Sequence, residues 1–289
     1  MGGEHYYRAY ILKKGIKCMR HLFFQFNRLK DSLKDKFIFL FLDYDGTLTP
    51  IAESPDKAVI PAKTMEILKG LSKNPRCRVA VISGRALKDI KNKIGLEGII
   101  YAGNHGLEIE GPKIKFRAPV PVAYKTALKK IRAILKKKLS EIKGAVVEDK
   151  GITLSVHYRL VDAKDVWLVK TIFHEVLAHY IVSDKVKIRP GKKVLEIRPP
   201  MEWDKGKIVL WLLARLKFIL GEEPCIPIYI GDDITDEDAF RALKGRGLTV
   251  FVGDSGKTHA EYYLENTQEV TEFLEWVLKI KTDEHICRN

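Results

Sequence analysis

One stretch of the sequence, FIFLFLDYDGTLTP (residues 37–50), constrains the fold more than any other. Its apolar run from Phe37 to Leu42 is typical of a strand buried on both faces, and Asp43 and Asp45 follow directly. Burying a charged carboxylate costs free energy unless the group is paired. A turn explains one Asp before a glycine, but it does not explain a second Asp two residues earlier on the same side of an extended chain. The two carboxylates therefore indicate a functional site at the end of a buried strand.

Similar strands recur along the chain and alternate with helices. Further apolar strands are predicted at residues 78–83, 98–104, 226–233 and 248–253. Helices are predicted at residues 61–74, 86–95, 204–220, 235–245 and 267–281. Continuous apolar strands that alternate with helices are typical of a parallel sheet covered on both faces. We therefore predict an α/β fold with a Rossmann-like, doubly wound parallel-sheet core, in which ligands bind beyond the carboxyl ends of the strands.

The segment between the two halves of this pattern has a different periodicity. In ITLSVHYR (152–159) the apolar residues occupy one face of the strand and the polar residues the other. Such strands form a sheet with helices on one side and a polar face on the other. We predict an inserted α+β cap domain at residues 108–199, which begins with the hairpin LEIEGPKIKF and determines substrate specificity. The catalytic core is then formed by residues 37–107 and 200–289.

Length and cysteine usage indicate the number of domains and the cellular compartment that we expect. A chain of 289 residues has room for two domains of ordinary size. No apolar run approaches the roughly 20 residues that cross a bilayer, so we expect no membrane span. The scattered cysteines favour reduced thiols and a cytoplasmic location. Residues 1–36 are too basic and too interrupted for a secretory signal. We leave this basic extension unassigned. It could contact a membrane surface or a partner, pack on the core, or form a loosely ordered leader.

The net charge of +14 is unevenly distributed. Most of the positive excess lies in residues 108–200, whereas residues 199–289 carry a net negative charge. A basic cap over an acidic site suits an anionic substrate held together with a metal ion. For most of these lysines, solubility or thermal stability is the simpler explanation.

Reactive side chains lie at the ends of three core strands and at the start of the helix that follows the insertion. The segments are DYDGT from Asp43, SGR from Ser83, DKG from Asp204 and GDDITDE from Gly231. In a doubly wound sheet these segments converge on one place. Several carboxylates cannot all be ionised close together without a cation, and a set of oxygen ligands favours Mg²⁺ over Zn²⁺. We therefore predict a Mg²⁺ site among the carboxylates.

This set of residues fits phosphoryl transfer. Asp43 can attack the phosphorus as a nucleophile, and Asp45 can donate a proton to the leaving oxygen and later accept one from water. Lys205 and Mg²⁺ offset the developing charge. Ser83 can hold a phosphoryl oxygen, or it can simply cap the following helix. Arg85 has two alternative roles, a contact to the phosphate and a structural salt bridge.

The four segments in this order resemble the motifs of the haloacid dehalogenase superfamily, and the long insertion resembles its larger cap type. The resemblance implies that Asp43 is both nucleophile and metal ligand. It implies that Asp45 is the acid/base group, with its backbone carbonyl on the metal. Asp232 would be a further metal ligand, and Asp236 would act at or just outside the metal shell. The aspartate at position 45 favours a phosphatase or phosphomutase.

Within that superfamily the chain resembles the trehalose-6-phosphate phosphatases from about Phe37 to its end. The matching segments are DYDGTLTPI, GNHGLEI, EDK at 148–150, SVHYR, KVLEIRP and GDDITDEDAF. The resemblance implies that Glu148, Lys150 and Glu196 hold the disaccharide. It also places the turn from Asn104 through His105 to Gly106 near the sugar and the phosphate. His157 and Arg159 on the polar face are further substrate-binding candidates; the alternative is a polar face that only meets solvent.

We therefore predict a Mg²⁺-dependent phosphatase that converts trehalose 6-phosphate to trehalose and phosphate through an aspartyl-phosphate. One alternative is a phosphatase or phosphomutase for another sugar phosphate. The other is a non-catalytic anion-binding protein, which salt-dependent retention of nucleic acid would favour. We expect a small-molecule substrate and no nucleic-acid partner. The chain is too short to include a fused synthase domain, and no residue supports a separate synthase partner.

Overall fold

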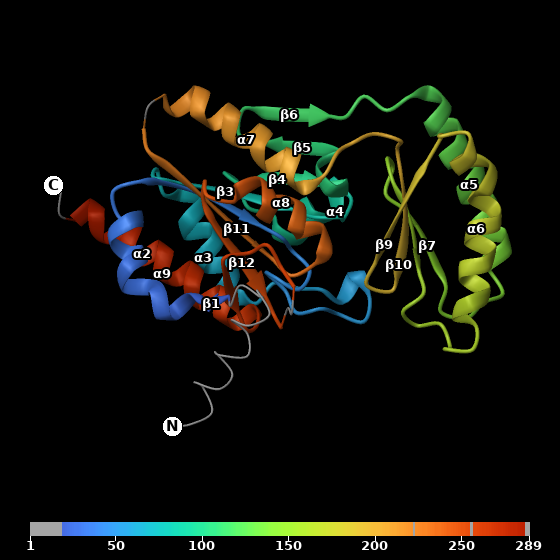
Figure 1. Cartoon of the computed structure of the whole chain (residues 1–289), viewed down its shortest axis with the longest axis horizontal. Coiled ribbons are helices and arrows are strands. Elements are labelled where there is room, and N and C mark those ends of the chain that lie inside the picture. Colours follow the sequence, from blue (N-terminus) through green and yellow to red (C-terminus); the bar gives the residue numbers. More distant parts are fainter. Residues whose placement is uncertain (1–18, 222, 255–256, 287–289) are drawn as a thin grey trace, which may run out of the picture.

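The computed structural model describes residues 19–221, 223–254 and 257–286 and contains two β-sheets (Figure 1). The larger, nine-stranded sheet has the order β1-β13-β12-β11-β2-β3-β4-β5-β6. From β1 to β4 all neighbouring strands pair in parallel. The bounds are β1 Arg20–His21, β13 Tyr262–Leu264, β12 Leu248–Val252, β11 Cys225–Gly231, β2 Phe37–Leu42, β3 Cys77–Ile82, β4 Ile100–Gly103, β5 Glu108–Gly111 and β6 Ile114–Arg117.

Helices cover both faces of the parallel part. One face carries α2 (Phe26–Leu33), α3 (Ala62–Lys73), α4 (Leu87–Ile94) and α9 (Thr267–Ile286). The other carries α7 (Lys205–Leu220) and α8 (Glu237–Leu243). Alternate residues of β2 serve the two layers, because Leu40 packs in the first cluster and Phe39 in the second. The predicted doubly wound core is confirmed, with β2 at its centre.

The second sheet is antiparallel and belongs to the inserted cap. Its order is β7-β8-β10-β9, with bounds Val146–Asp149, Leu154–His157, Val194–Arg198 and Lys187–Gly191. The helices α5 (Val122–Leu139) and α6 (Val166–Val182) pack on one of its faces. Figure 1 shows both helices on the side away from the core, so that the other face of the sheet is turned toward the core. This arrangement confirms the predicted α+β cap.

The hairpin β5–β6 lies on the core sheet and not in the cap. Strand β5 pairs antiparallel with β4, with Ala102 opposite Ile109. Ile109 and Ile114 are buried in the same cluster as α7. The prediction that the insertion begins at residue 108 with this hairpin was therefore wrong. Alternation shows that one face of a strand is buried, but it does not show against which sheet.

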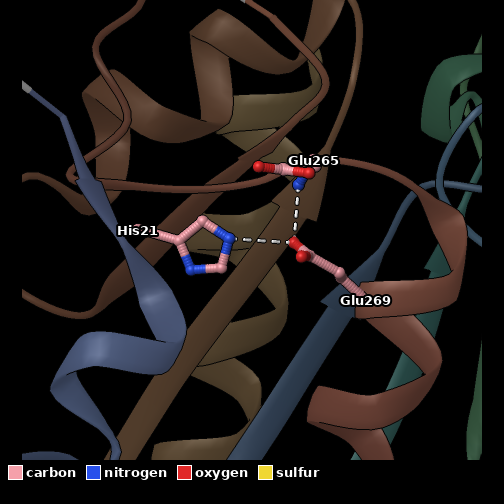
Figure 2. Close-up of side chains that lie close together, drawn as sticks. All are labelled: His21, Glu265 and Glu269. Carbon is pink, nitrogen blue, oxygen red and sulfur yellow. Dashed lines mark hydrogen bonds and ion pairs between the residues drawn. The ribbon is translucent and has the colours of Figure 1, made fainter.

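Part of the N-terminal extension packs on the core, and residues 1–18 lie outside the described residues. Strand β1 pairs with the edge strand β13, and Phe26 stacks on Trp276 with ring centroids 4.3 Å apart. Figure 2 shows the ring of His21 facing Glu269, with 3.1 Å between Nε2 and a carboxylate oxygen. Among the described helices, none is both long and apolar enough to cross a bilayer. From residue 19 onward, the extension is an added layer of the core.

The remaining elements are single 3₁₀ turns. They are η1 Leu22–Gln25, η2 Pro55–Lys57, η3 Asn104–Gly106 and η4 Ile234–Asp236. Two of them matter for the site, because η3 follows β4 and η4 follows β11 at the carboxyl edge of the core sheet.

Candidate active site

A cavity of about 430 Å³ lies between the carboxyl edge of the core sheet and the polar face of the cap. Most of the predicted site residues line it. These are Asp43, Asp45, Ser83, Arg85, His105, Glu148, Lys150, His157, Arg159, Glu196, Lys205 and Asp232. Among the described residues, the predicted Asn104, Gly106 and Asp236 are not part of this lining. The fold therefore brings twelve of the fifteen candidates to one cavity, from the ends of different elements.

Lys205 is the centre of a buried ion-pair network at the core wall. This residue begins α7, and its Nζ lies 2.6 Å from Oδ1 of Asp43 and 2.6 Å from Oδ1 of Asp236. The Tyr229 hydroxyl also donates to Oδ1 of Asp236 at 2.6 Å. The other oxygen of Asp236 accepts the backbone N–H groups of Asp232 and Asp233. Asp236 is fully buried, so it holds Lys205 and the loop after β11 from behind the cavity wall.

Burial shifts the ionisation of these groups. Burial first, and then the neighbouring Asp236 and Asp232, hold the pKa of Asp43 well above its usual range, although Lys205 opposes this. Burial also raises the pKa of Asp232 to about 6. Burial lowers the pKa of Lys205, but Asp236 and Asp43 more than offset this and raise it above the ordinary value. Lys205 therefore stays positively charged, but its charge is not enough to keep the pKa values of Asp43 and Asp232 in their usual range.

The carboxylates at this wall fit a divalent cation. One oxygen from each of Asp43, Asp232 and Asp236 lies within 4.8 Å of the other two. Oδ1 of Asp232 is buried and has no hydrogen-bond partner among the described residues. Gly46 leaves room for this carboxylate, since a Cβ there would lie 2.2 Å from Oδ2 of Asp232. A donor set made only of oxygen suits a hard cation.

Asp45 and Arg85 form a bidentate pair at the cavity wall. The guanidinium contacts the two carboxylate oxygens of Asp45 at 2.8 and 2.6 Å and Asp89 at 2.9 Å. This geometry supports the structural salt bridge for Arg85, and its phosphate contact stays a prediction. The Ser83 hydroxyl accepts the backbone N–H of Arg85 at 3.1 Å, which leaves its own proton to donate into the cavity.

Glu196 anchors the opposite wall. This cap carboxylate is buried and lies 2.5 Å from Nε of Arg198, 3.0 Å from Nε2 of His105 and 3.4 Å from Nζ of Lys150. Although burial raises its pKa, His105, Lys150 and Arg198 hold the pKa of Glu196 well below the usual range. Burial, together with Arg198, lowers the pKa of His105 to about 4. At neutral pH a carboxylate and a lysine of the cap thus lie beside a neutral imidazole of the core.

The remaining cap candidates lie on the same face. Glu148 and His157 are 2.7 Å apart, and Lys150 lies 4.0 Å from Glu148. Burial raises the pKa of Glu148, but His157 and Lys150 lower it overall. Arg159 donates to the backbone carbonyl of Lys192 at 3.0 Å. These groups offer both donors and acceptors to a polyhydroxylated ligand.

Lys192 is a cavity residue that the sequence reasoning missed. It lies in the turn between β9 and β10, and its Nζ reaches from the cap to Oδ2 of Asp232 at 2.7 Å. The available signal was the pair Lys192-Lys193 at the tip of a hairpin in the polar-faced sheet. Sequence alone does not show which end of that hairpin meets the core.

The sequence matches the family model described as trehalose-phosphatase over residues 41–268. The chain belongs to the trehalose-phosphatase family. It is 38% identical over 270 residues to the probable trehalose-phosphate phosphatase D of Arabidopsis thaliana, with 89% of this chain and 71% of that protein covered. It is 37% identical over 251 residues to a trehalose-phosphate phosphatase of Mycobacterium bovis, with coverage of 85% and 62%.

A solved structure shares the fold of this family member. The C-terminal domain of the C. albicans trehalose-6-phosphate phosphatase superposes with a TM-score of 0.73 at 27% identity, covering 91% of this chain and 99% of that one. The chain is therefore an enzyme of this family, a phosphoric monoester hydrolase.

Proposed function

We propose that the protein hydrolyses trehalose 6-phosphate to trehalose and inorganic phosphate in a Mg²⁺-dependent reaction through an aspartyl-phosphate. One observation carries the proposal: a single cavity joins two kinds of wall. The core wall has the buried Asp43–Lys205–Asp236 network, and the cap wall has the charged groups around Glu196. The first suits a phosphoryl group and the second a sugar. The relatives named for trehalose phosphate support this substrate.

Asp43 is the nucleophile in this proposal. Lys205 hydrogen-bonds one oxygen of Asp43 at 2.6 Å and leaves the other to attack phosphorus. The bond from phosphorus to the sugar oxygen breaks, and the phosphoryl group passes to Asp43. Lys205 and Lys192 carry positive charge next to this position, and the Ser83 hydroxyl donates to a phosphoryl oxygen. Asp43 and Asp232 would hold a Mg²⁺ ion, with Asp236 behind them, and the bound ion would supply further charge neutralisation.

Asp45 moves the protons. In its protonated form it gives the proton to the leaving sugar oxygen. The resulting carboxylate then takes a proton from the water that attacks the aspartyl-phosphate, which releases phosphate, restores Asp43 and returns Asp45 to its protonated form. Its bidentate contact with Arg85 has to loosen for the first step, because a carboxylate held by two guanidinium N–H groups accepts hydrogen bonds and does not donate them. A phosphate group bound beside Arg85 would compete with Asp45 for the guanidinium and so loosen this contact.

The cap wall holds the disaccharide. Glu148, Glu196 and Lys150 provide acceptors and donors for sugar hydroxyls, and the neutral His105 adds an imidazole. The cavity volume lies in the range that encloses ligands of this size. Closure of the cap on the core excludes bulk water while the phosphoryl group is transferred. The cytoplasmic location expected from the cysteines stays a prediction, and a separate synthase partner stays open with no residue to support it.

Phosphate release from a panel of esters tests this proposal. The panel contains trehalose 6-phosphate, glucose 6-phosphate, sucrose 6-phosphate and mannose 6-phosphate, each with Mg²⁺ and with EDTA. We expect kcat/KM for trehalose 6-phosphate to exceed the others by about a hundredfold or more, and EDTA or Asp43→Asn to abolish turnover. Asp162→Asn, an exposed change on the cap, is the matched control and should behave as wild type. Preference for a different sugar would overturn the substrate, and metal-independent release would overturn the chemistry.

A further inference from the structure

The tip of the hairpin between β7 and β8 docks on the core. This tip, residues 150–153, carries Lys150 of the cavity wall and includes the buried Ile152 and Thr153. Ile152 packs in a small apolar cluster with Leu107 and Ala118, at the junction of core and cap. The position of Lys150 is therefore set by how this tip rests on the core.

Asn104 provides the polar part of that contact. Its Nδ2 donates to the backbone carbonyl of Lys150 at 3.1 Å and to Glu108 at 2.8 Å. Its Oδ1 accepts the hydroxyl of Thr153 at 2.8 Å. Asn104 is fully buried, and its amide group is occupied by the cap tip and by β5. A direct contact between this amide and a ligand in the cavity would require breaking these bonds.

The backbone of the same turn is fixed to the phosphate side of the site. The Asn104 N–H donates to the carbonyl of Arg85 at 2.7 Å, and the His105 N–H donates to the carbonyl of Ser83 at 2.9 Å. Asn104 and His105 both have left-handed backbones, with φ of 51° and 53°. Asparagine tolerates this conformation better than most residues. The turn therefore joins the loop after β3 to the cap tip.

Lys150 of the cap also contacts the loop after β3. Lys150 Nζ donates to the carbonyl of Gly84 at 2.9 Å and lies 3.4 Å from Glu196. The Thr153 hydroxyl, besides its bond to Asn104, lies 3.5 Å from Glu196. Moving the tip would displace Lys150 relative to both the loop and the buried carboxylate.

We propose that Asn104 is a positioning residue that couples the sugar-binding wall of the cap to the phosphate-binding loop of the core. This inference rests on the proposed function, because it assigns the sugar to the cap. It replaces the predicted substrate contact of Asn104 with an indirect role through Lys150 and Thr153. An ester without a sugar does not use the cap wall, so its turnover does not depend on this coupling.

Three variants separate the amide from the backbone and from the fold. Asn104→Gly keeps the left-handed backbone and removes the amide, because glycine adopts positive φ readily. Thr153→Val keeps the side-chain shape and removes the donor to Oδ1 of Asn104. Thr153→Ser keeps the hydroxyl and is the matched control. Each is assayed with trehalose 6-phosphate and with 4-nitrophenyl phosphate, and hydrogen exchange is followed in residues 150–157.

The two substrates must respond differently. We expect the ratio of kcat/KM for trehalose 6-phosphate to that for 4-nitrophenyl phosphate to fall by about tenfold or more in Asn104→Gly and Thr153→Val, and to stay within about twofold in Thr153→Ser. A parallel loss on both substrates, or no loss on either, would show a merely structural role and overturn the inference.

Hydrogen exchange keeps the two proposals separate. If the wild type shows no preference for trehalose 6-phosphate, the proposed function fails and the coupling is judged by exchange alone. The coupling predicts faster exchange in residues 150–157 of Asn104→Gly and Thr153→Val, and unchanged exchange in Thr153→Ser. Unchanged exchange in all three variants would overturn it.

Discussion

Gly46 follows the two aspartates of the first motif and has a steric role in the site. Its φ of 91° lies outside the range that L side chains adopt easily, and a Cβ would lie 2.2 Å from Oδ2 of Asp232. The backbone at residue 46 can therefore pass close to the carboxylate that follows β11. The glycine of DYDGT thus keeps Asp232 beside Asp43, where both can share a cation.

Replacing this glycine should damage both the fold and the proposed metal site. We expect Gly46→Ala to destabilise the protein by about 2–4 kcal/mol, because backbone strain and a steric clash add. The displaced carboxylate should lower kcat/KM by about a hundredfold or more. Urea unfolding and phosphate release measure the two effects.

Gly95 is the matched control for that change. Its φ is 63°, but a methyl group there would meet no described atom within 4 Å. Gly95→Ala should cost only about 1 kcal/mol and leave turnover unchanged. Equal effects of the two substitutions would contradict the role given to Gly46.

At the scale of elements, α9 holds the N-terminal layer in place. Lys281 on this helix is fully buried, and its Nζ donates to the backbone carbonyls of Leu33 and Lys36 at 2.7 Å each and also to that of Lys34. These carbonyls end α2 and follow it, where a helix leaves acceptors without internal partners. A buried lysine is costly unless such acceptors surround it. Its position ties the α2 layer to the last helix.

Removing this cation should weaken the fold and not the chemistry. Lys281→Met removes the cationic donor shared by these three carbonyls, so we expect a loss of about 2–4 kcal/mol in the free energy of unfolding. Lys279→Met changes an exposed lysine on the same helix and should have little effect. Urea titrations of both variants provide the measurement, with kcat at low temperature as the control for the site. A Lys281→Met protein as stable as wild type would contradict the anchoring role.

Much of the core could be predicted because its signals are local. The run before Asp43 is apolar on both faces, so it identifies a central strand, and the polar segments at strand ends identify the carboxyl edge. The hairpin at Glu108–Arg117 was misplaced because its alternation reports one buried face and not the identity of the neighbouring sheet. The role of Asn104 could also not be predicted from local information. A side-chain amide can hydrogen-bond either a ligand or the protein, and only the folded turn shows that the amide of Asn104 bonds to Lys150 and Thr153 of the cap tip.

At the scale of the whole molecule, the cap and core complete one another. The core contributes the carboxylates, and the cap contributes Lys192 to Asp232 and Glu196 to His105. At Lys192 a basic cap residue thus faces an acidic core residue across the cavity. The uneven distribution of the net positive charge along the chain corresponds to this arrangement. For most of the lysines, however, the simpler role in solubility still applies.

Magnesium should stabilise the whole protein in a pH-dependent way. A ligand at about a hundred times its Kd that binds only the native state adds about 2.7 kcal/mol. Burial raises the pKa of Asp232 to about 6, so protons compete with the metal below that pH. We expect Mg²⁺ to raise Tm at about pH 7.5 and to raise it much less at about pH 5. Asp232→Asn should remove most of the shift at both pH values.

Without metal, in EDTA, the effect of the Asp232 carboxyl on stability has the opposite dependence on pH. Because its folded pKa is raised, the contribution of Asp232 to stability is present below its unfolded pKa of about 4 and is lost as pH rises through about 6. Thermal unfolding with and without metal across this range measures both signs. A Mg²⁺ shift of the same size at every pH would contradict the assignment of Asp232 as a ligand.

In the proposed reaction Asp43 accepts the phosphoryl group of trehalose 6-phosphate. Acid quenching of the enzyme during steady turnover with Mg²⁺, followed by mass spectrometry of the peptide that contains Asp43, tests it most directly. We expect a phosphoryl group on Asp43 of the wild type and none in Asp43→Asn, which should also release no phosphate. Release of phosphate from trehalose 6-phosphate with no phosphoryl group on Asp43, or with one on a different residue, would show that Asp43 is not the nucleophile.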